Sequence, residues 1–173
     1  TLGTVADRFA IAVQSAAAAQ PRVPPFVSIE PGMDAVLEVD AGDLRRQPPG
    51  TYEGAIVLTS VSSGQSIRIP YWLAVPTGAP SSIVVLSVPG AARPGATVNI
   101  YFRVVDVTGM PVNEPALTVS VPQGGGAVTQ VRPPPPVAPG VYQIVFRMGN
   151  APGNNVIRLR AGEVTRDVLI VGE

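Results

Sequence analysis

Short segments in which apolar and polar residues alternate make up most of the chain, and glycine and proline separate these segments. A period of two places the apolar side chains on one face of a β-strand. In the first part of the chain, this pattern predicts strands over residues 9–13, 26–29, 37–40, 52–58 and 67–75.

The second part of the chain continues the pattern. It predicts strands over residues 98–105, 117–121, 142–146, 157–160 and 164–171. Counting other segments as well, such as the one reached at Val128 after the glycine turn, we expect about seven strands in residues 80–173, which is the number in an immunoglobulin-like sandwich. Helix signals are scarce, so the sequence predicts an all-β protein.

A boundary lies between the two parts. Residues 77–82 combine small residues with proline and separate two strand-rich halves. We therefore expect two tandem immunoglobulin/fibronectin-like β-sandwiches, over residues 1–76 and 80–173. The connecting segment is short, so we expect a semi-rigid joint.

Pro70 lies inside the strand expected over residues 67–75. Proline lacks the N–H group that pairs with a neighbouring strand. We therefore expect this strand at a sheet edge, or bulged at Pro70.

Composition limits the chemistry of the chain. It has 12 acidic and 12 basic residues, no His and no Cys, and every basic residue is Arg. Without His or Cys it cannot form a Ser-His-Asp triad or an ordinary zinc, copper or iron site. Without Lys it has no phosphate-loop lysine and no Schiff base. We expect no catalytic residue and no cofactor in this chain.

The charge balance bears on partners. Net charge is zero and only 14% of the residues are charged, which argues against nucleic acid as a partner. No apolar run reaches the roughly 18 residues of a membrane-spanning helix, so we expect no membrane span. The sequence does not begin with Met and has no signal-peptide pattern, and we expect an upstream region before Thr1.

The densest acidic group is Glu38, Asp40 and Asp43, with Asp34 nearby. Several oxygen ligands are what Ca²⁺ prefers, so the group is a candidate calcium site. The loop pattern of an EF-hand is missing. The alternative, which we favour, is the solvated face of a strand opposite Leu37 and Val39.

Trp72 is the only tryptophan, and it falls on the opposite phase to Tyr71 and Leu73. One interpretation is an exposed platform for sugars or peptides. The interpretation that we favour is burial at an interdomain contact, because the expected boundary starts a few residues later.

Three further features have both a functional and a structural interpretation. Residues 133–136 are four prolines, which fit a peptide ligand or a stiff loop. Gly124, Gly125 and Gly126 fit a turn better than a phosphate site, because no Lys and no helix follow. Arg158 and Arg160 fit an anion site or, as we expect, an exposed strand face.

Two segments of the first part occur together. They are Gly-Thr-Tyr-Glu-Gly at residues 50–54 and Ile-Arg-Ile-Pro-Tyr-Trp-Leu-Ala-Val-Pro at residues 67–76, and residues 35–40 fit the same pattern. In these segments residues 1–76 resemble the C-terminal fibronectin-type-III-like domain of bacterial subtilisin-like serine proteases. The resemblance carries no catalytic residue to this chain, and it implies an upstream catalytic domain in the same polypeptide.

The second part of the chain, residues 80–173, also resembles a known domain, but on fewer residues. Residues 104–112 and 139–142, with turns at residues 152–155 and 161–162, are similar to those of a bacterial invasin-type immunoglobulin-like domain. Together the two resemblances imply a secreted or cell-surface bacterial protein.

In the subtilisin-associated domains a further strand precedes the segment that matches Thr1 to Phe9. The resemblance therefore implies that this strand lies upstream and that Asp7 to Val13 forms an unpaired sheet edge. Apolar edge strands pair readily with other chains. We expect weak self-association through the edge from Phe9 to Val13.

The predicted function is a non-catalytic accessory module of a secreted subtilisin-like serine protease, which packs on, spaces or positions the catalytic domain. The alternative is an adhesion or carbohydrate-binding module of a bacterial cell-surface protein. An independent hydrolase that uses paired carboxylates is a third hypothesis.

Overall fold

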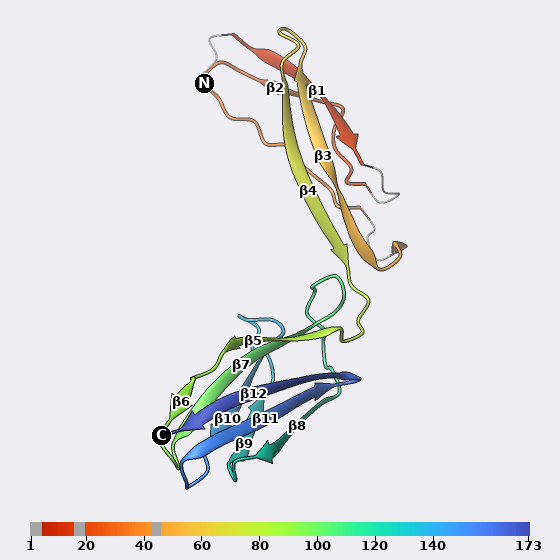
Figure 1. The fold of residues 1–173 in the computed structure, drawn as a ribbon. Helices are drawn as coiled ribbons and strands as arrows, with labels where there is room; N and C mark the ends of the chain where they lie inside the picture. Colours follow the sequence, from red (N-terminus) through yellow and green to blue (C-terminus); the bar gives the residue numbers. More distant parts are fainter. Residues whose placement is uncertain (1–4, 16–19, 43–45) are drawn as a thin grey trace. The chain divides into compact units, whose positions relative to one another are not determined.

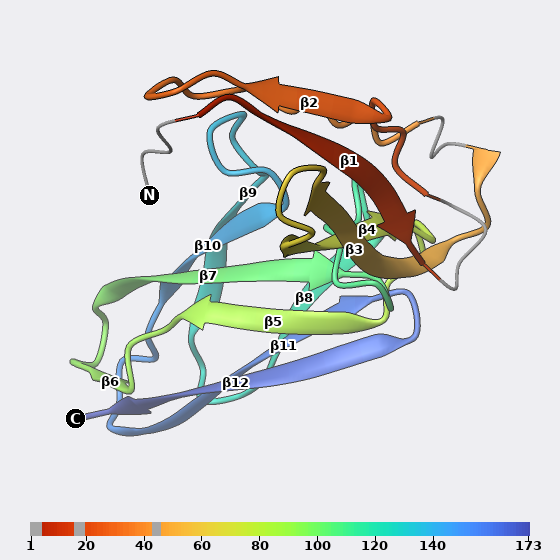
Figure 2. The ribbon, with the colours of Figure 1, turned by 90° about the horizontal axis from the view of Figure 1, so that it is seen from above.

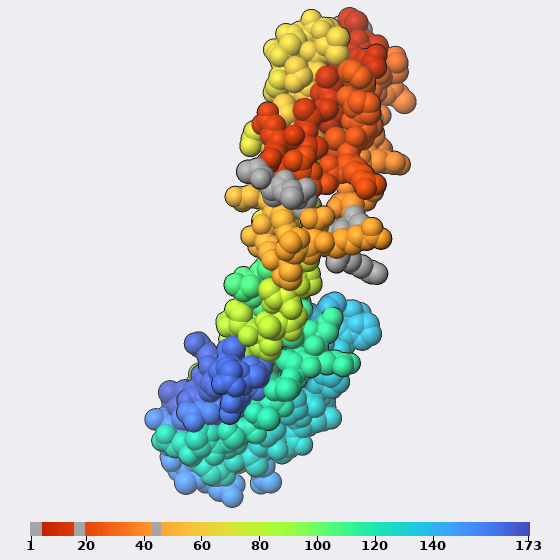
Figure 3. Space-filling model, turned by 90° about the vertical axis from the view of Figure 1, so that its right-hand side faces the viewer, coloured from red at the N-terminus to blue at the C-terminus, as the bar shows by residue number. Residues whose placement is uncertain are grey.

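Strands are the regular elements that the computed structural model assigns within residues 5–15, 20–42 and 46–173, which are the residues it describes. The predicted all-β fold class is confirmed. The chain divides into two units, Thr1–Val75 and Pro76–Glu173. Figure 3 colours the first from red to yellow-green and the second from green to blue.

The first unit contains a four-stranded antiparallel sheet in the order β2-β1-β3-β4 (Figures 1 and 2). Its strands are β1 (Asp7–Gln14), β2 (Phe26–Ile29), β3 (Gly50–Ser60) and β4 (Ser66–Val75). A sandwich needs two sheets, and the described residues of this unit form one. The segment expected as a strand over residues 37–40 contributes a single bridge, between Arg22 and Asp40.

The expectation of an unpaired sheet edge over Asp7 to Val13 is wrong for Asp7 to Ile11. β1 lies inside the sheet, because β2 returns antiparallel along one side of it and β3 pairs with the other side. Beyond β2, the N–H of Ile11 donates to the carbonyl oxygen of Pro25 at 2.9 Å. The backbone N–H and C=O groups of Asp7 to Ile11 are therefore already paired with β2 and the residue before it. They are not free to pair with a second chain, as the prediction of self-association requires.

The two edges of the first sheet are β2 and β4. The expectation that the strand with Pro70 lies at an edge is thereby confirmed. Pro70 is opposite Ala55 of β3, and no strand among the described residues pairs with the other side of β4. The missing N–H of Pro70 costs the sheet nothing at such a position.

One face of the first sheet, here called the apolar face, carries large aliphatic and aromatic side chains from all four strands. Residues that pair across strands share a face, so the register defines its members: Val27, Ile29, Phe9, Ile11, Val13, Ile56, Leu58, Ile67 and Ile69. Ile56 and Leu58 in the centre are 3% and 9% exposed, whereas Ile67 and Ile69 on the edge strand are 55% and 43% exposed. This face is thus covered only in part.

The second unit is a β-sandwich of two four-stranded sheets that pack face to face (Figures 1 and 2). One sheet has the order β5-β7-β10-β9 and the other the order β6-β12-β11-β8. The strands are β5 (Ser82–Ser87), β6 (Ala91–Ala92), β7 (Thr97–Val105), β8 (Leu117–Gln123), β9 (Ala127–Arg132), β10 (Val141–Arg147), β11 (Gly153–Ala161) and β12 (Val164–Gly172).

A contiguous apolar core fills this sandwich. β7 contributes Phe102, whose ring stacks on that of its cross-strand neighbour Tyr142 at 5.4 Å between centroids. Ile157 and Leu159 come from the opposite sheet and are fully buried. Alternation along β7, β10 and β11 therefore produces the core that the period-two pattern predicts.

The segment Gly124 to Gly126 carries the chain from one sheet of the sandwich to the other, since β8 pairs with β11 and β9 pairs with β10. This agrees with the turn predicted there. The buried side chain of Asn155 braces the corner, and its Oδ1 accepts a hydrogen bond from the N–H of Gly149 at 3.1 Å. A Cβ at Gly126 would lie 2.7 Å from the carbonyl oxygen of Arg147 and 2.9 Å from that Oδ1.

We expect Gly126→Ala to destabilise the second unit, because the added methyl group meets backbone and a fixed side chain. Overpacking of this kind costs about 1–3 kcal/mol, which lowers the melting temperature of a domain this size by several degrees. Thermal unfolding followed by circular dichroism measures the change. Gly90→Ala is the matched control, since a Cβ there meets nothing within 4 Å. Equal melting temperatures for the two variants would contradict this account.

Candidate functional site

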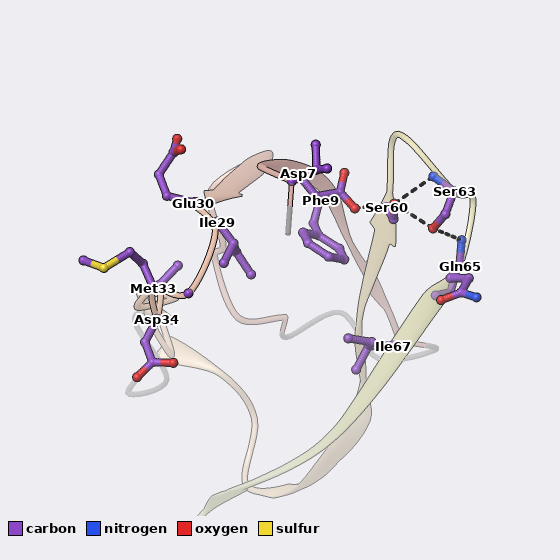
Figure 4. A pocket seen from close by; sticks show the side chains of 14 residues that line it. Asp7, Phe9, Ile29, Glu30, Met33, Asp34, Ser60, Ser63, Gln65 and Ile67 are labelled. Atoms are coloured by element: carbon purple, nitrogen blue, oxygen red, sulfur yellow. Dashed lines mark hydrogen bonds between the residues drawn. The ribbon is translucent and has the colours of Figure 1, made fainter. Parts of the chain in front are cut away.

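A pocket of about 850 Å³ opens at one end of the first sheet, on its apolar face (Figure 4). All four strands reach it, and the segment Glu30 to Ala35 forms its opposite wall. We call it the sheet-end pocket. The lining residues are Val5, Asp7, Phe9, Ile29, Glu30, Gly32, Met33, Asp34, Ala35, Ser60, Ser63, Gln65, Ser66 and Ile67.

A hydrogen-bonded network fixes one wall of the pocket. The hydroxyl of Ser60, a buried residue at the end of β3, donates to Oδ2 of Asp7 at 2.6 Å. The Ser60 oxygen accepts from the N–H of Ser63 at 3.0 Å, and Oγ of Ser63 accepts from the N–H of Gln65 at 3.3 Å. These bonds hold the tight connection between β3 and β4 in place.

The same network sets the charge of Asp7. The hydrogen bond from Ser60 lowers the pKa of the Asp7 carboxyl, and its effect outweighs the desolvation that raises it. Asp7 is therefore an anion at neutral pH. Its contact with Ser60 does not make Ser60 a nucleophile, because a carboxylate of lowered pKa is a poor base and Ser60 is 3% exposed.

The rest of the pocket combines apolar walls with an acidic rim. Phe9, Ile29 and Ile67 point into the space between the two walls, as Figure 4 shows. Glu30 and Asp34 are exposed at the rim. The arrangement can bury an apolar group and place a cation beside it, and it offers no group suited to covalent catalysis.

The candidate calcium ligands do not form a site among the described residues. Glu38 and Asp40 are exposed, and Oδ1 of Asp40 accepts a hydrogen bond from the N–H of Gly42 at 2.9 Å. Asp43 lies outside the residues that the structure describes. Within the described ranges, no group of three or more acidic, His or Cys residues is placed to hold a metal ion.

Trp72 lies on the face of the first sheet opposite to the apolar face, across from Glu53 of β3. It is 55% exposed, so its own sheet does not provide the burial that the sequence analysis expects. Its role as an interdomain contact stays a prediction.

In the second unit, the most perturbed carboxyl is that of Asp106, directly after β7. It is 3% exposed. Its Oδ1 accepts hydrogen bonds from the N–H of Thr108 at 2.8 Å, the hydroxyl of Thr108 at 2.6 Å and the N–H of Met110 at 3.1 Å. Its Oδ2 accepts from the N–H and the hydroxyl of Thr77 at 2.5 and 3.2 Å.

The pKa of Asp106 follows from these contacts. Burial raises it, but the hydrogen bonds from Thr108, Thr77 and Met110 together outweigh burial and lower it to about 2. Both carboxylate oxygens are occupied by donors of the protein itself. The group therefore holds the turn that closes with Gly109, whose φ is 80°, rather than serving a ligand.

The remaining candidates take structural positions. The guanidinium of Arg158 forms two hydrogen bonds with the carboxylate of Asp167, at 2.8 and 2.7 Å, and Arg160 donates to the carbonyl oxygen of Gly162. The prolines at positions 133–136 lie in the loop between β9 and β10, where the N–H of Ala138 donates to the carbonyl oxygen of Pro135. These contacts favour the structural interpretations.

Sequence reasoning missed the sheet-end pocket and the role of Asp106. The pocket brings together residues from four strands and a loop. The spacing of residues along the sequence does not predict that they meet. Asp106 did carry a signal, because an Asp two residues before Thr and three before Gly is typical of a side-chain-capped turn.

Comparisons with known proteins give structural similarities. No protein-family model matches the chain, and no curated protein matches it. Solved structures of similar fold include domains 4 and 5 of the S-layer protein SbsC, with 17% identity, a TM-score of 0.46, and coverage of 72% of this chain and 65% of that one. The C-terminal domain of ZirS has 24% identity, a TM-score of 0.46, and coverage of 56% and 70%.

The adhesin FdeC of Escherichia coli is similar over the whole of this chain and 55% of its own, with 14% identity and a TM-score of 0.43. The chain thus spans less than two thirds of the SbsC and FdeC structures. Similarity at this level does not assign a function. The described residues contain no helix long and apolar enough to cross a membrane.

We expect Asp106→Asn to destabilise the second unit by about 2–4 kcal/mol, because the new amide N–H group faces donors and hydrogen bonds to a charged group contribute about 1.5–3 kcal/mol each. Chemical denaturation measures the change. Asp167→Ala is the control, since its ion pair with Arg158 is solvent-exposed and its loss should change the stability much less.

The lowered pKa also predicts a pH dependence. The stabilisation from Asp106 is complete above its unfolded pKa of 3.8 and is lost as pH falls toward its folded pKa of about 2. Unfolding free energy of the native protein should therefore fall over this range more steeply than that of Asp106→Asn. Parallel curves for the two proteins would rule out Asp106 as the cause.

Proposed function

We propose that the chain is a non-catalytic accessory module of a secreted or cell-surface protein, and that it spaces and positions a neighbouring domain. The observation that carries the proposal is the joint between the two units. β4 of the first unit ends at Val75, and Thr77 is hydrogen-bonded through its N–H to the buried Asp106 of the second unit. Only Pro76 lies between these two residues.

We expect a joint of this kind to resist reorientation. The ring of Pro76 fixes its own φ angle near −65°, and it restricts Val75 to extended conformations. Flexible linkers need many residues with free dihedral angles. A rigid joint suits a spacer better than a tether.

The use of the buried polar groups also supports a structural role. Asp106, Thr108 and Asn155 are buried in the second unit, and each has its hydrogen bonds within a turn or corner. Enzymes keep perturbed carboxyls open to a substrate, whereas Asp106 accepts only from its own chain. These contacts support a module that holds shape.

We further propose that the neighbour is an upstream catalytic domain of the subtilisin-like type, in the same polypeptide. This finer proposal rests on the residue pattern at positions 50–54 and 67–76, as set out above. A nucleophile motif of Gly-Thr-Ser type in an upstream region would support it, and an upstream region of another class would overturn it.

A second candidate function is an adhesion or carbohydrate-binding module, and the exposure of Trp72 favours it. An exposed Trp beside polar side chains is a common platform for sugar rings. Trp72 pairs with Glu53 across the strands, and Glu53 also lines a cavity of about 520 Å³ together with Gln14 and Arg68. Because Trp72 is the only Trp, quenching of its fluorescence by oligosaccharides tests this function directly.

The spacing role is tested by the distance distribution between spin labels on the two units. The chain has no Cys, so Val61→Cys with Glu163→Cys supplies the labels; both positions are exposed. We expect a narrow distribution in the native protein. Inserting a short Gly-Ser segment between Pro76 and Thr77 should broaden it at least about twofold, because the joint becomes flexible.

The control is the same insertion after Val137, a residue that is 93% exposed in a loop of the second unit. It should leave the distribution unchanged. If the native distribution is as broad as that of the Pro76 insertion, the chain is not a rigid spacer.

A further inference from the structure

The apolar face of the first sheet is incompletely covered at its edge strand. Leu58 and Ile67 face each other across β3 and β4, yet Leu58 is 9% and Ile67 is 55% exposed. Ile69, two residues along the same strand, is 43% exposed. In a sandwich a second sheet covers such side chains, and the described residues of this unit supply only the segment Glu30 to Ala35 over the pocket end.

The exposed apolar side chains form a strip that runs along β4. It begins in the sheet-end pocket at Ile67 and continues along β4 to Ile69, with the two-residue spacing of a strand. An extended peptide has the same repeat, so its alternate side chains match this strip. The pocket volume of about 850 Å³ lies within the roughly 300–1,000 Å³ range of ligand sites.

The charge of the lining residues favours a positively charged ligand. Asp7, Glu30 and Asp34 line the pocket, and no Arg is among the described lining residues. The hydrogen bonds and ion pairs found in the described part of the chain leave the Glu30 and Asp34 side chains without a partner. A ligand with positive charges would supply the missing counter-charges.

The carboxylates are spread along the rim rather than converging. No group of acidic residues within the described ranges is placed to hold a metal ion, and Figure 4 shows Glu30, Asp34 and Asp7 at separate points around the opening. Separate charges suit a ligand whose cations are themselves separated by apolar groups.

We propose that the sheet-end pocket and the strip along β4 bind a basic, extended segment of a partner polypeptide. An apolar side chain of the segment enters between Phe9, Ile29 and Ile67, and flanking Arg or Lys side chains pair with Glu30, Asp34 and Asp7. This interaction goes beyond the spacing role and does not depend on it.

The test uses a short synthetic peptide in which arginine and isoleucine alternate, and a counterpart with glutamate in place of arginine. Isothermal titration of the whole chain gives the affinities, and amide chemical shifts locate the site. We expect the basic peptide to bind, to shift residues of the pocket and β4, and to bind more weakly as salt screens the charges. The acidic peptide should not bind.

Two variants separate charge from apolar contact. Glu30→Gln with Asp34→Asn should weaken binding about five- to tenfold, as expected for two exposed ion pairs, while Ile67→Thr should weaken it at least about threefold. The matched controls are Glu38→Gln and Val36→Thr, which change exposed residues that do not line the pocket. Both controls should bind as the native chain does.

Several outcomes would overturn the proposal. They are equal binding of the basic and acidic peptides, absence of binding by the basic peptide, shifts confined to residues outside the pocket and β4, or equal losses in the variants and their controls. None of these outcomes bears on the spin-label distances, so the spacing role would stand or fall separately.

Discussion

A buried carboxylate organises the start of the second unit. Asp106 accepts hydrogen bonds from Thr108 and Met110 on one side and from Thr77 on the other, and thus ties the turn after β7 to the residue where the chain leaves the joint. A buried charge is stable only when its oxygens are satisfied in this way. One side chain therefore closes the turn and fixes the end of the joint at the same time.

The two units solve the problem of burying apolar strand faces differently. In the second unit each sheet is the other's cover, so Phe102, Ile144 and Leu159 are fully buried in a shared core. In the first unit the described residues form one sheet, and the apolar face is closed over its centre but not over β4. The second unit thus buries its own apolar strand faces. The first unit leaves apolar side chains of β4 exposed, where a binding partner can cover them.

The sequence predicted local structure well and long-range pairing less well. Strands such as β7 and β11 follow from strict alternation, and the edge position of β4 follows from a chemical fact about Pro70. The run of apolar residues in β5 has no alternation, which hides it from a period-two search. Which strand pairs with β1 depends on where the chain returns after it, and no local pattern contains that information.

The candidate site shows the same limit. Phe9, Ile29 and Ile67 each belong to a predicted strand, but their meeting at one end of the sheet follows from the register of three strand pairings together. The expected burial of Trp72 rested on its nearness to the boundary along the chain. In the structure it lies across from Glu53 on the face opposite to the apolar face, and its own sheet leaves it 55% exposed, so its burial at an interdomain contact stays a prediction.

The incomplete cover of the first sheet links stability to binding. A ligand that binds only the folded unit raises its stability in proportion to the logarithm of ligand concentration over the dissociation constant. The exposed side chains of Ile67 and Ile69 contribute little while they face water, and they contribute fully once a partner covers them. Recognition and spacing are thus compatible in one chain, since the first depends on the apolar face of one sheet and the second on Pro76 and the hydrogen bonds of Asp106.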